Sequence, residues 1–248
     1  MELGLQLYTL RELMTDEDSI KRTLKSVKEI GYSGVQIYGS LELAEKMGLA
    51  AIDNGLTVMG STMSFDLMCE QTERVIDLHK RLATENAGIG GYFKYTGYED
   101  ALDFIGRANS LAKKLANGGL RFSYHNHSHE FLRVTDEKTI FDLLYEGLDE
   151  NIDFVLDTYW IQHGGADVRY WIEKLASRTR ILHIKDMKMT KEGPAFAEIG
   201  CGNLRWDLIV PLANRLGIPY LVVEQDRCDG DPLESVKTSF NYMKKHFM

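Results

Sequence analysis

Short apolar runs alternate with longer amphipathic segments along the whole chain, and this alternation constrains the fold more than any other feature. Eight runs have the length and composition of strands, and most are largely apolar instead of strictly alternating. Such runs are typical of parallel strands that are buried on both faces. The predicted strands are Leu3–Tyr8, Gly34–Tyr38, Leu56–Ser61, Gly88–Phe93, Leu120–His125, Ile152–Asp157, Ile181–Lys185 and Tyr220–Glu224.

Each predicted strand is followed by a segment with helical periodicity. These segments are Asp16–Ile30, Leu41–Asn54, Phe65–Glu85, Glu99–Ala116, Glu137–Gly147, Val168–Ser177, Leu204–Leu216 and Pro232–His246. Eight strand–helix units predict an α/β fold, the closed (β/α)8 TIM barrel, as a single domain over residues 1–248. An open doubly wound sheet is the alternative. It usually carries a glycine-rich phosphate loop after the first strand, whereas Leu7-Tyr8-Thr9-Leu10-Arg11 stands there.

Composition narrows the class of protein. Among 248 residues there are 29 Lys and Arg against 37 Asp and Glu, a net charge of −8, and no basic stripe that would favour nucleic-acid binding. No apolar run approaches the roughly 20 residues that span a bilayer, so we expect no membrane partner. The N-terminus lacks a secretory signal pattern, and the three cysteines form no CxxC pair. We therefore expect a cytoplasmic enzyme or small-molecule binder, and the sequence leaves open whether it forms a homo-oligomer.

Metal-ligating residue types gather where the last four predicted strands end. The fifth strand leads into His125-Asn126-His127-Ser128-His129-Glu130-Phe131, the sixth ends at Asp157, the seventh carries His183-Ile184-Lys185-Asp186, and the eighth ends at Glu224. Reactive groups of such barrels lie at this end of the strands. The sequence therefore predicts a metal site made of Glu130, Asp157, His183 and Glu224. Three carboxylates and one imidazole favour Mn²⁺, with Mg²⁺, Co²⁺ or Zn²⁺ as alternatives.

Each of these residues also has a purely structural interpretation. Asp157 precedes Thr158 and has the character of a helix cap, and His183 between Leu182 and Ile184 has that of a hydrogen-bonded core histidine. The metal-site interpretation rests on the coincidence of the residues at four consecutive strand ends.

These segments resemble the sugar phosphate isomerase/epimerase family of xylose isomerase-like TIM barrels. The likeness rests on the HNHxxEF pattern at His125–Phe131, on Asp157-Thr158-Tyr159-Trp160, on the HxKD pattern at His183–Asp186, and on Glu224-Gln225-Asp226. The resemblance covers essentially the whole chain. It implies one divalent ion held by Glu, Asp, His and Glu, which match Glu130, Asp157, His183 and Glu224.

The predicted site suits proton abstraction beside a carbonyl group. A divalent ion stabilises the enediolate that forms, while Glu130 and Glu224 act as the acid and base on the two faces of the substrate carbon. The predicted activity is that of a metal-dependent sugar, keto-sugar or sugar phosphate isomerase or epimerase acting on a small carbohydrate. Further residues expected to bind the substrate are Gln6, Tyr8, His127, Trp160 and Lys185; an ion pair of Lys185 with Asp186 or Glu224 is the alternative.

Three other functions remain open from the sequence. An inosose dehydratase-like lyase would use the same ion and base to expel water. A phosphodiesterase resembling the apurinic endonucleases would need more ligands at the first four strand ends and a basic DNA-binding face. A sugar-binding barrel without catalysis would not need both Glu130 and Glu224.

Overall fold

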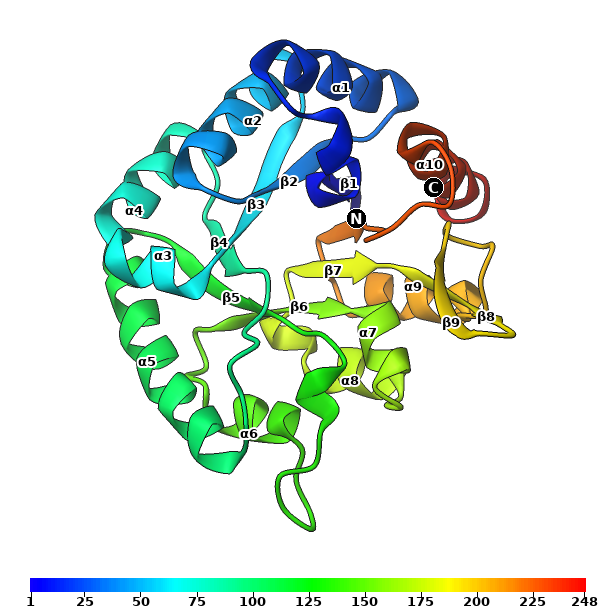
Figure 1. Ribbon diagram of the computed structural model, residues 1–248. Helices are drawn as coiled ribbons and strands as arrows, with labels where there is room; N and C mark the ends of the chain where they lie inside the picture. Colours follow the sequence, from blue (N-terminus) through cyan, green and yellow to red (C-terminus); the bar gives the residue numbers. More distant parts are fainter.

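Eight parallel strands close into a barrel in the computed structural model, which describes residues 1–248 (Figure 1). Their order around the barrel is β1-β10-β7-β6-β5-β4-β3-β2. Their bounds are Glu2–Gln6 (β1), Gly34–Tyr38 (β2), Thr57–Met63 (β3), Asn86–Ile89 (β4), Arg121–His125 (β5), Asp153–Asp157 (β6), Ile181–Ile184 (β7) and Tyr220–Val223 (β10). The prediction of a closed (β/α)8 barrel is confirmed, and every predicted strand corresponds to a barrel strand.

The helices form a ring outside the barrel, as Figure 1 shows. Their bounds are Glu17–Ile30 (α1), Leu41–Asp53 (α2), Phe65–Glu70 (α3), Thr72–Arg81 (α4), Tyr98–Asn117 (α5), Ile140–Gly147 (α6), Thr158–His163 (α7), Val168–Lys174 (α8), Trp206–Arg215 (α9) and Pro232–Phe247 (α10). Local signals fix several helix starts. Asp16, for example, accepts a hydrogen bond from the Ser19 backbone N–H in a capping box.

Two apolar clusters hold the layers together. The larger lies between the barrel and its helices, and the smaller fills the barrel interior with Met59, Val155, Ile181 and Val222. Gly4 leaves room for this interior cluster, because a Cβ there would lie 2.4 Å from the Met59 sulfur. A packed interior leaves only the ends of the strands free to form a site.

Several segments differ from the predicted elements: α7 was not predicted, and the fourth strand ends at Ile89 and not at Phe93. The first strand ends at Gln6 because the 3-10 helix Leu7–Leu13 follows, and the predicted helix Phe65–Glu85 divides into α3 and α4 at Gln71. The segment after β7 forms an antiparallel hairpin of β8 (Asp186–Thr190) and β9 (Gly193–Ala197) before α9 begins.

The buried carboxylate of Asp186 organises the chain after this hairpin. It accepts hydrogen bonds from the backbone N–H groups of Gly200 (2.9 Å) and Gly202 (3.1 Å) and from the Trp206 indole (2.7 Å). Gly202 has no room for a side chain, because a Cβ would lie 2.3 Å from Asp186 Oδ1. Asp186 is thus committed to the loop and does not pair with the preceding Lys185.

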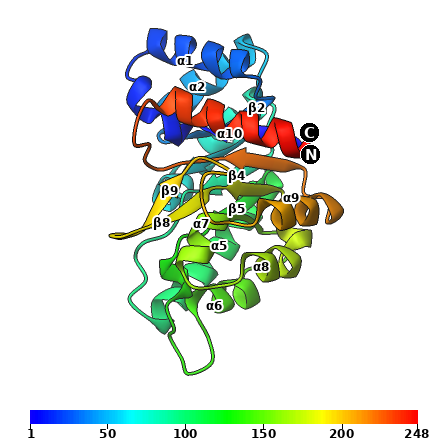
Figure 2. The same ribbon diagram turned by 90° about the vertical axis from the view of Figure 1, so that its right-hand side faces the viewer.

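The two ends of the barrel differ. The β8–β9 hairpin projects from one side in Figure 2, and the two termini lie together on the other. Met1 and Met248 line the same shallow groove there. No helix of the chain has both the length and the apolar character needed to span a membrane.

Candidate metal centre and cavity

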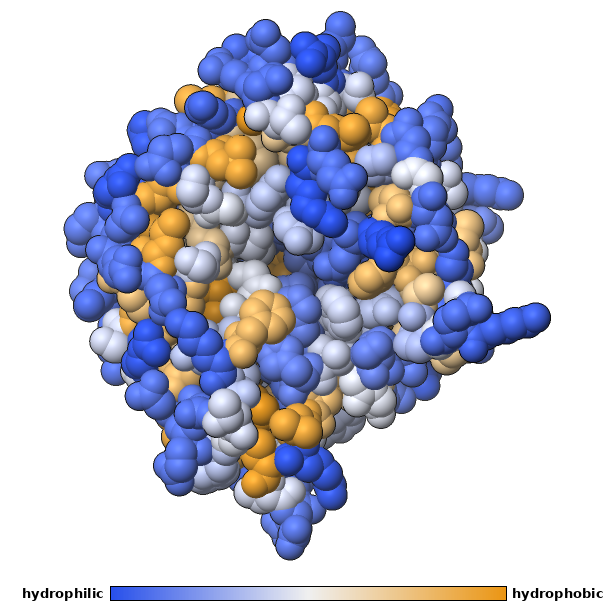
Figure 3. All heavy atoms as spheres, in the orientation of Figure 1, coloured by the Kyte–Doolittle hydropathy of each residue, from blue (hydrophilic) through white to orange (hydrophobic).

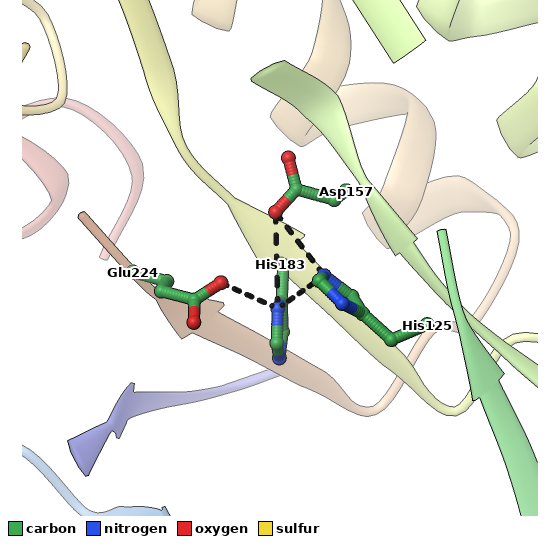
Figure 4. Close-up of side chains that lie close together, drawn as sticks. All are labelled: His125, Asp157, His183 and Glu224. Carbon is green, nitrogen blue, oxygen red and sulfur yellow. Dashed lines mark hydrogen bonds and ion pairs between the residues drawn. The ribbon is translucent and has the colours of Figure 1, made fainter. Parts of the chain in front are cut away.

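Four buried side chains converge at the carboxyl ends of neighbouring strands. His125 ends β5, Asp157 ends β6, His183 lies on β7, and Glu224 follows β10. One potential ligand atom from each lies within 4.8 Å of the others. Figure 4 shows the four side chains pointing toward one another. The strand register explains the convergence, because Asp157 pairs with His183, and His183 pairs with Val222, two residues before Glu224.

Short contacts link the four groups. His125 Nε2 lies 3.3 Å from Asp157 Oδ2 and 3.1 Å from His183 Nδ1. His183 Nδ1 lies 3.0 Å from Glu224 Oε2. The arrangement directs two ring nitrogens and two carboxylate oxygens to one point.

Three of the four predicted ligands belong to this group, and Glu130 does not. Its carboxylate is fully buried but accepts hydrogen bonds from the Tyr124 hydroxyl (2.6 Å) and the His127 backbone N–H (2.8 Å). The reason is local, since the 3-10 helix His129–Phe131 turns the Glu130 side chain back toward its own strand. His125 stands in the place expected for Glu130.

His125 was missed as a member of the group although it lies in the HNHxxEF segment. A signal was present in the sequence, because His125 ends its predicted strand as Asp157 ends the next. In a parallel barrel such residues meet at the same rim.

A cavity of about 540 Å³ opens above the group. Figure 3 shows this face of the molecule, hollowed near its centre. Gln6, Tyr8 and His127, which the sequence analysis expects to bind the substrate, line the cavity together with Glu224 and Asp226. Trp160 and Lys185 are not among the lining residues.

Neighbouring side chains orient the four groups. The backbone N–H of Trp160 donates to Asp157 Oδ1 at 2.9 Å, so Asp157 also caps α7. Gln36 Oε1 lies 2.5 Å from His183 Nε2, and Gln6 Nε2 donates to the same oxygen at 3.0 Å. Such partners fix the ring orientation of ligating histidines in metal sites.

Lys185 places a positive charge beside the four converging side chains, on the side away from the cavity. Its Nζ lies 2.9 Å from Asp157 Oδ2, 2.8 Å from Glu224 Oε2 and 2.6 Å from Asp226 Oδ2. Burial disfavours ionisation of Glu224, but Lys185 and His183 hold the pKa of this carboxyl well below its ordinary value. Asp226 was not predicted, although it stands two residues after Glu224.

Burial disfavours the protonated form of the histidines of the site. It lowers the pKa of His183, and together with the charges of His125 and Lys185 it lowers the pKa of His127 to about 2. Burial acts in the same direction on His125, but the hydrogen bond to Asp157 and the charge of Glu224 raise its pKa overall. Neutral imidazole is the form that binds a metal, and His183 and His127 are held in it.

The residues fit a divalent cation. Two imidazoles and two carboxylates match the ligands of Mn²⁺, Zn²⁺ and related ions. Glu224 Oε2 is buried, and its near neighbours are His183 Nδ1 at 3.0 Å and Lys185 Nζ at 2.8 Å.

Comparison with known proteins places the fold and site in context. The model of the xylose isomerase-like TIM barrel family matches residues 24–246. The chain belongs to this family. Among curated proteins, this xylose isomerase-like barrel is similar to an inosose dehydratase of Mesomycoplasma hyopneumoniae. The two are 22% identical, over 91% of this chain and 88% of the relative.

Two solved structures share the fold of this xylose isomerase-like barrel. A sugar phosphate isomerase/epimerase from Parabacteroides distasonis has a TM-score of 0.83 and 23% identity, covering 99% of this chain and 94% of the other. A xylose isomerase-like TIM barrel protein from Mycobacterium smegmatis, in complex with magnesium, has a TM-score of 0.72 and 13% identity. That match covers 98% and 95% of the two chains.

Proposed function

We propose that this chain is a metal-dependent isomerase or epimerase that moves a proton at the carbon beside the carbonyl of a carbohydrate. The observation that carries the proposal is the group His125, Asp157, His183 and Glu224 at the floor of an open cavity. Membership of the xylose isomerase-like family and the likeness to a sugar phosphate isomerase/epimerase support it.

The four residues of this group are proposed to hold one divalent ion. Mn²⁺ remains the expected ion, and the magnesium complex of the Mycobacterium smegmatis protein supports a hard divalent cation. When bound, such an ion supplies positive charge that polarises a carbonyl oxygen and stabilises the enediolate. Glu130, predicted as a ligand, is instead proposed to position the segment from His125 to His127 through its hydrogen bond to the His127 N–H.

Two carboxylates are proposed to move the proton. Glu224 and Asp226 both line the cavity, and each has one carboxylate oxygen in an ion pair with Lys185. Glu130 is shielded from the cavity, so Asp226 replaces it here as the partner of Glu224. One carboxylate takes the proton from carbon and the other, protonated, returns a proton to the opposite face or to the neighbouring carbon.

The cavity lining favours an uncharged substrate. No lysine or arginine stands among its lining residues, whereas phosphate binding generally relies on such cations. Other lining residues carry hydroxyl groups, namely Ser40, Thr62 and Ser64. Tyr8 and Tyr38 add aromatic surface, with ring centroids 5.4 Å apart. We therefore propose a free polyhydroxylated ketone or aldehyde as the substrate.

Dehydration is the second candidate. The inosose dehydratase relative is similar over most of both chains, which favours this alternative. The first step is the same, because removal of a proton beside a carbonyl precedes loss of a hydroxyl group from the next carbon. The two reactions differ in where the electron pair goes after the enediolate forms.

Deuterium exchange tests the proposal. The Mn²⁺-loaded protein is incubated in D₂O with a panel of free ketoses, aldoses, keto-sugars and inososes, and products are analysed by NMR and mass spectrometry. Isomerisation or epimerisation incorporates deuterium without loss of water, and dehydration removes one water. The variant Glu224→Gln loses the exchange, and Glu192→Gln, at an exposed residue of the β8–β9 turn, retains it. No exchange with any substrate by metal-loaded protein would contradict the proposal.

A further inference from the structure

The ammonium group of Lys185 is enclosed by three carboxylates. It lies within 3 Å of oxygens of Asp157, Glu224 and Asp226, and the Lys185 side chain is fully buried. All three contacts are ion pairs, with Nζ–oxygen distances of 2.9, 2.8 and 2.6 Å. The interaction is therefore mainly one of charge, which acts at close range in a buried site.

Lys185 does not face the substrate cavity. Glu224 and Asp226 line the cavity, whereas Lys185 does not. The aromatic rings of Trp160 and Phe196 lie 5.5 Å and 5.9 Å from Nζ. A cation in this position acts on the carboxylates and not directly on a substrate.

The net charge of these residues follows from counting their ionised forms. With all three carboxylates ionised and the histidines neutral, Asp157, Glu224 and Asp226 contribute −3 and Lys185 contributes +1, which gives −2. This sum is equal and opposite to the charge of a divalent ion. Without Lys185 the same residues would carry −3.

We propose that Lys185 is an internal counter-ion that sets the charge of the metal centre and thereby its preference for divalent over trivalent cations. Asp226, which lines the cavity, partly neutralises the positive charge of Lys185. This inference rests on the metal centre of the proposed function. It assigns Lys185 and Asp226 opposite electrostatic effects on the same ion.

The reasoning is electrostatic. A metal ion at the proposed centre shares Asp157 and Glu224 with Lys185, so the ammonium repels the ion and reduces the negative potential that attracts it. Repulsion grows with the charge of the ion, so it weakens binding of a trivalent ion more. Removing the Lys185 charge therefore strengthens binding, and removing the Asp226 charge weakens it. If the two residues only maintained the shape of the site, both changes would weaken binding.

The experiment measures cation affinity, not turnover. Mn²⁺ binding is followed by isothermal titration calorimetry, and Tb³⁺ binding by luminescence. The variants are Lys185→Met, Asp226→Asn and the double variant. Lys188→Met and Asp229→Asn serve as matched controls. They make the same changes of residue type in an ion pair of the protein surface, in which Lys188 Nζ lies 3.0 Å from Asp229 Oδ2.

We expect Lys185→Met to bind Mn²⁺ about tenfold more tightly and to gain more for Tb³⁺. Asp226→Asn should weaken Mn²⁺ binding by about tenfold, and the double variant should lie within about threefold of the unaltered protein. The control variants should change neither affinity. Weaker Mn²⁺ binding in both single variants, or an equal gain for both ions in Lys185→Met, would overturn the inference.

A second comparison covers the case in which Lys185→Met does not fold with three unbalanced carboxylates. Lys185→Gln in the Asp226→Asn background leaves two carboxylates, and it must bind Mn²⁺ more tightly than Asp226→Asn alone. Equal or weaker binding would also overturn the inference. Failure of the unaltered protein to bind any divalent ion would instead contradict the proposed function.

Discussion

The hydroxyl of Tyr124 lies 2.6 Å from Oε1 of Glu130, six residues further along the chain. Both groups are fully buried, and the hydroxyl of Tyr95 lies 3.3 Å from that of Tyr124. This chain of hydrogen bonds commits the Glu130 carboxylate to the turn after β5. The candidate metal-binding group contains His125 and not Glu130.

Replacing Glu130 by Gln should therefore affect stability more than metal binding. The Tyr124 hydroxyl and the His127 N–H both donate to the carboxylate, and in the variant one of them would face the amide NH₂ group. A buried donor without an acceptor lowers the free energy of unfolding by about 1–3 kcal/mol. Urea denaturation should show this loss, while calorimetry should give an Mn²⁺ affinity within about threefold of the unaltered protein. A loss well beyond the roughly 100-fold that removal of an outer-sphere partner costs would instead identify Glu130 as a ligand.

Metal addition and removal should change thermal stability through Asp157. An ion that binds only the folded protein stabilises it by about 2.7 kcal/mol at 100 times the dissociation constant, so Mn²⁺ should raise the Tm and EDTA should reverse the effect. Asp157→Asn should lose this response. Asparagine still caps α7, so the fold should persist.

The matched control for this change is Asp167→Asn, at the cap of α8. Asp167 accepts hydrogen bonds from Arg169 and Tyr170 and lies outside the group of four. This variant should keep the full response to Mn²⁺. A normal response in Asp157→Asn would show that Asp157 does not hold the ion.

Stability should fall in acid because of His79, a buried residue of α4 that is not part of the group of four. Its ring lies 2.8 Å from Ser61 Oγ, and burial lowers its pKa below the ordinary value of 6.5. The unfolded chain therefore takes up a proton at a higher pH than the folded protein. The stabilising contribution is complete above pH 6.5 and declines as the pH falls toward the folded-state pKa.

Urea denaturation between pH 8 and pH 5 checks this sign. His79→Gln keeps a polar group for Ser61 but cannot titrate, so its stability should decline less steeply below about pH 6.5. Because other histidines titrate in both proteins, the difference between the two profiles is the measured quantity. Parallel profiles would contradict the prediction.

Arg121 and Asp153 should stabilise the barrel without affecting the site. Arg121 Nε and Nη2 each lie 2.6 Å from an Asp153 carboxylate oxygen, at the start of β5 and β6. Arg121→Met would leave a buried charge unpaired and should cost about 2–3 kcal/mol, because Arg121 is partly exposed and the cost for a fully buried pair is higher. Adding Asp153→Asn should recover part of the loss, and Mn²⁺ affinity should not change.

The barrel was predictable because its signal is local. Buried parallel strands are apolar throughout, so eight short apolar runs identified eight strands within a few residues. The hairpin of β8 and β9 was not predicted, since its stability depends on contacts with the loop that Asp186 organises. The division of α3 from α4 depends on the backbone of Gln71, which carries no clear sequence signal.

The site was predictable only as far as strand ends determine it. Asp157, His183 and Glu224 meet because the barrel register brings them to one rim. Glu130 stands five residues beyond its strand, and the turn that redirects it depends on Tyr124. The enclosure of Lys185 by three carboxylates depends equally on tertiary packing, which residue spacing does not reveal.

The four converging side chains all come from β5, β6, β7 and the end of β10, whereas most other cavity-lining residues come from the ends of β1, β2 and β3 and from the segments after β1 to β4. Under the proposed function, catalysis and substrate recognition would therefore be encoded in different halves of the polypeptide. Exchanging the loops near Tyr8, Tyr38 and Ser64 would then alter the substrate preference and leave the candidate metal centre unchanged.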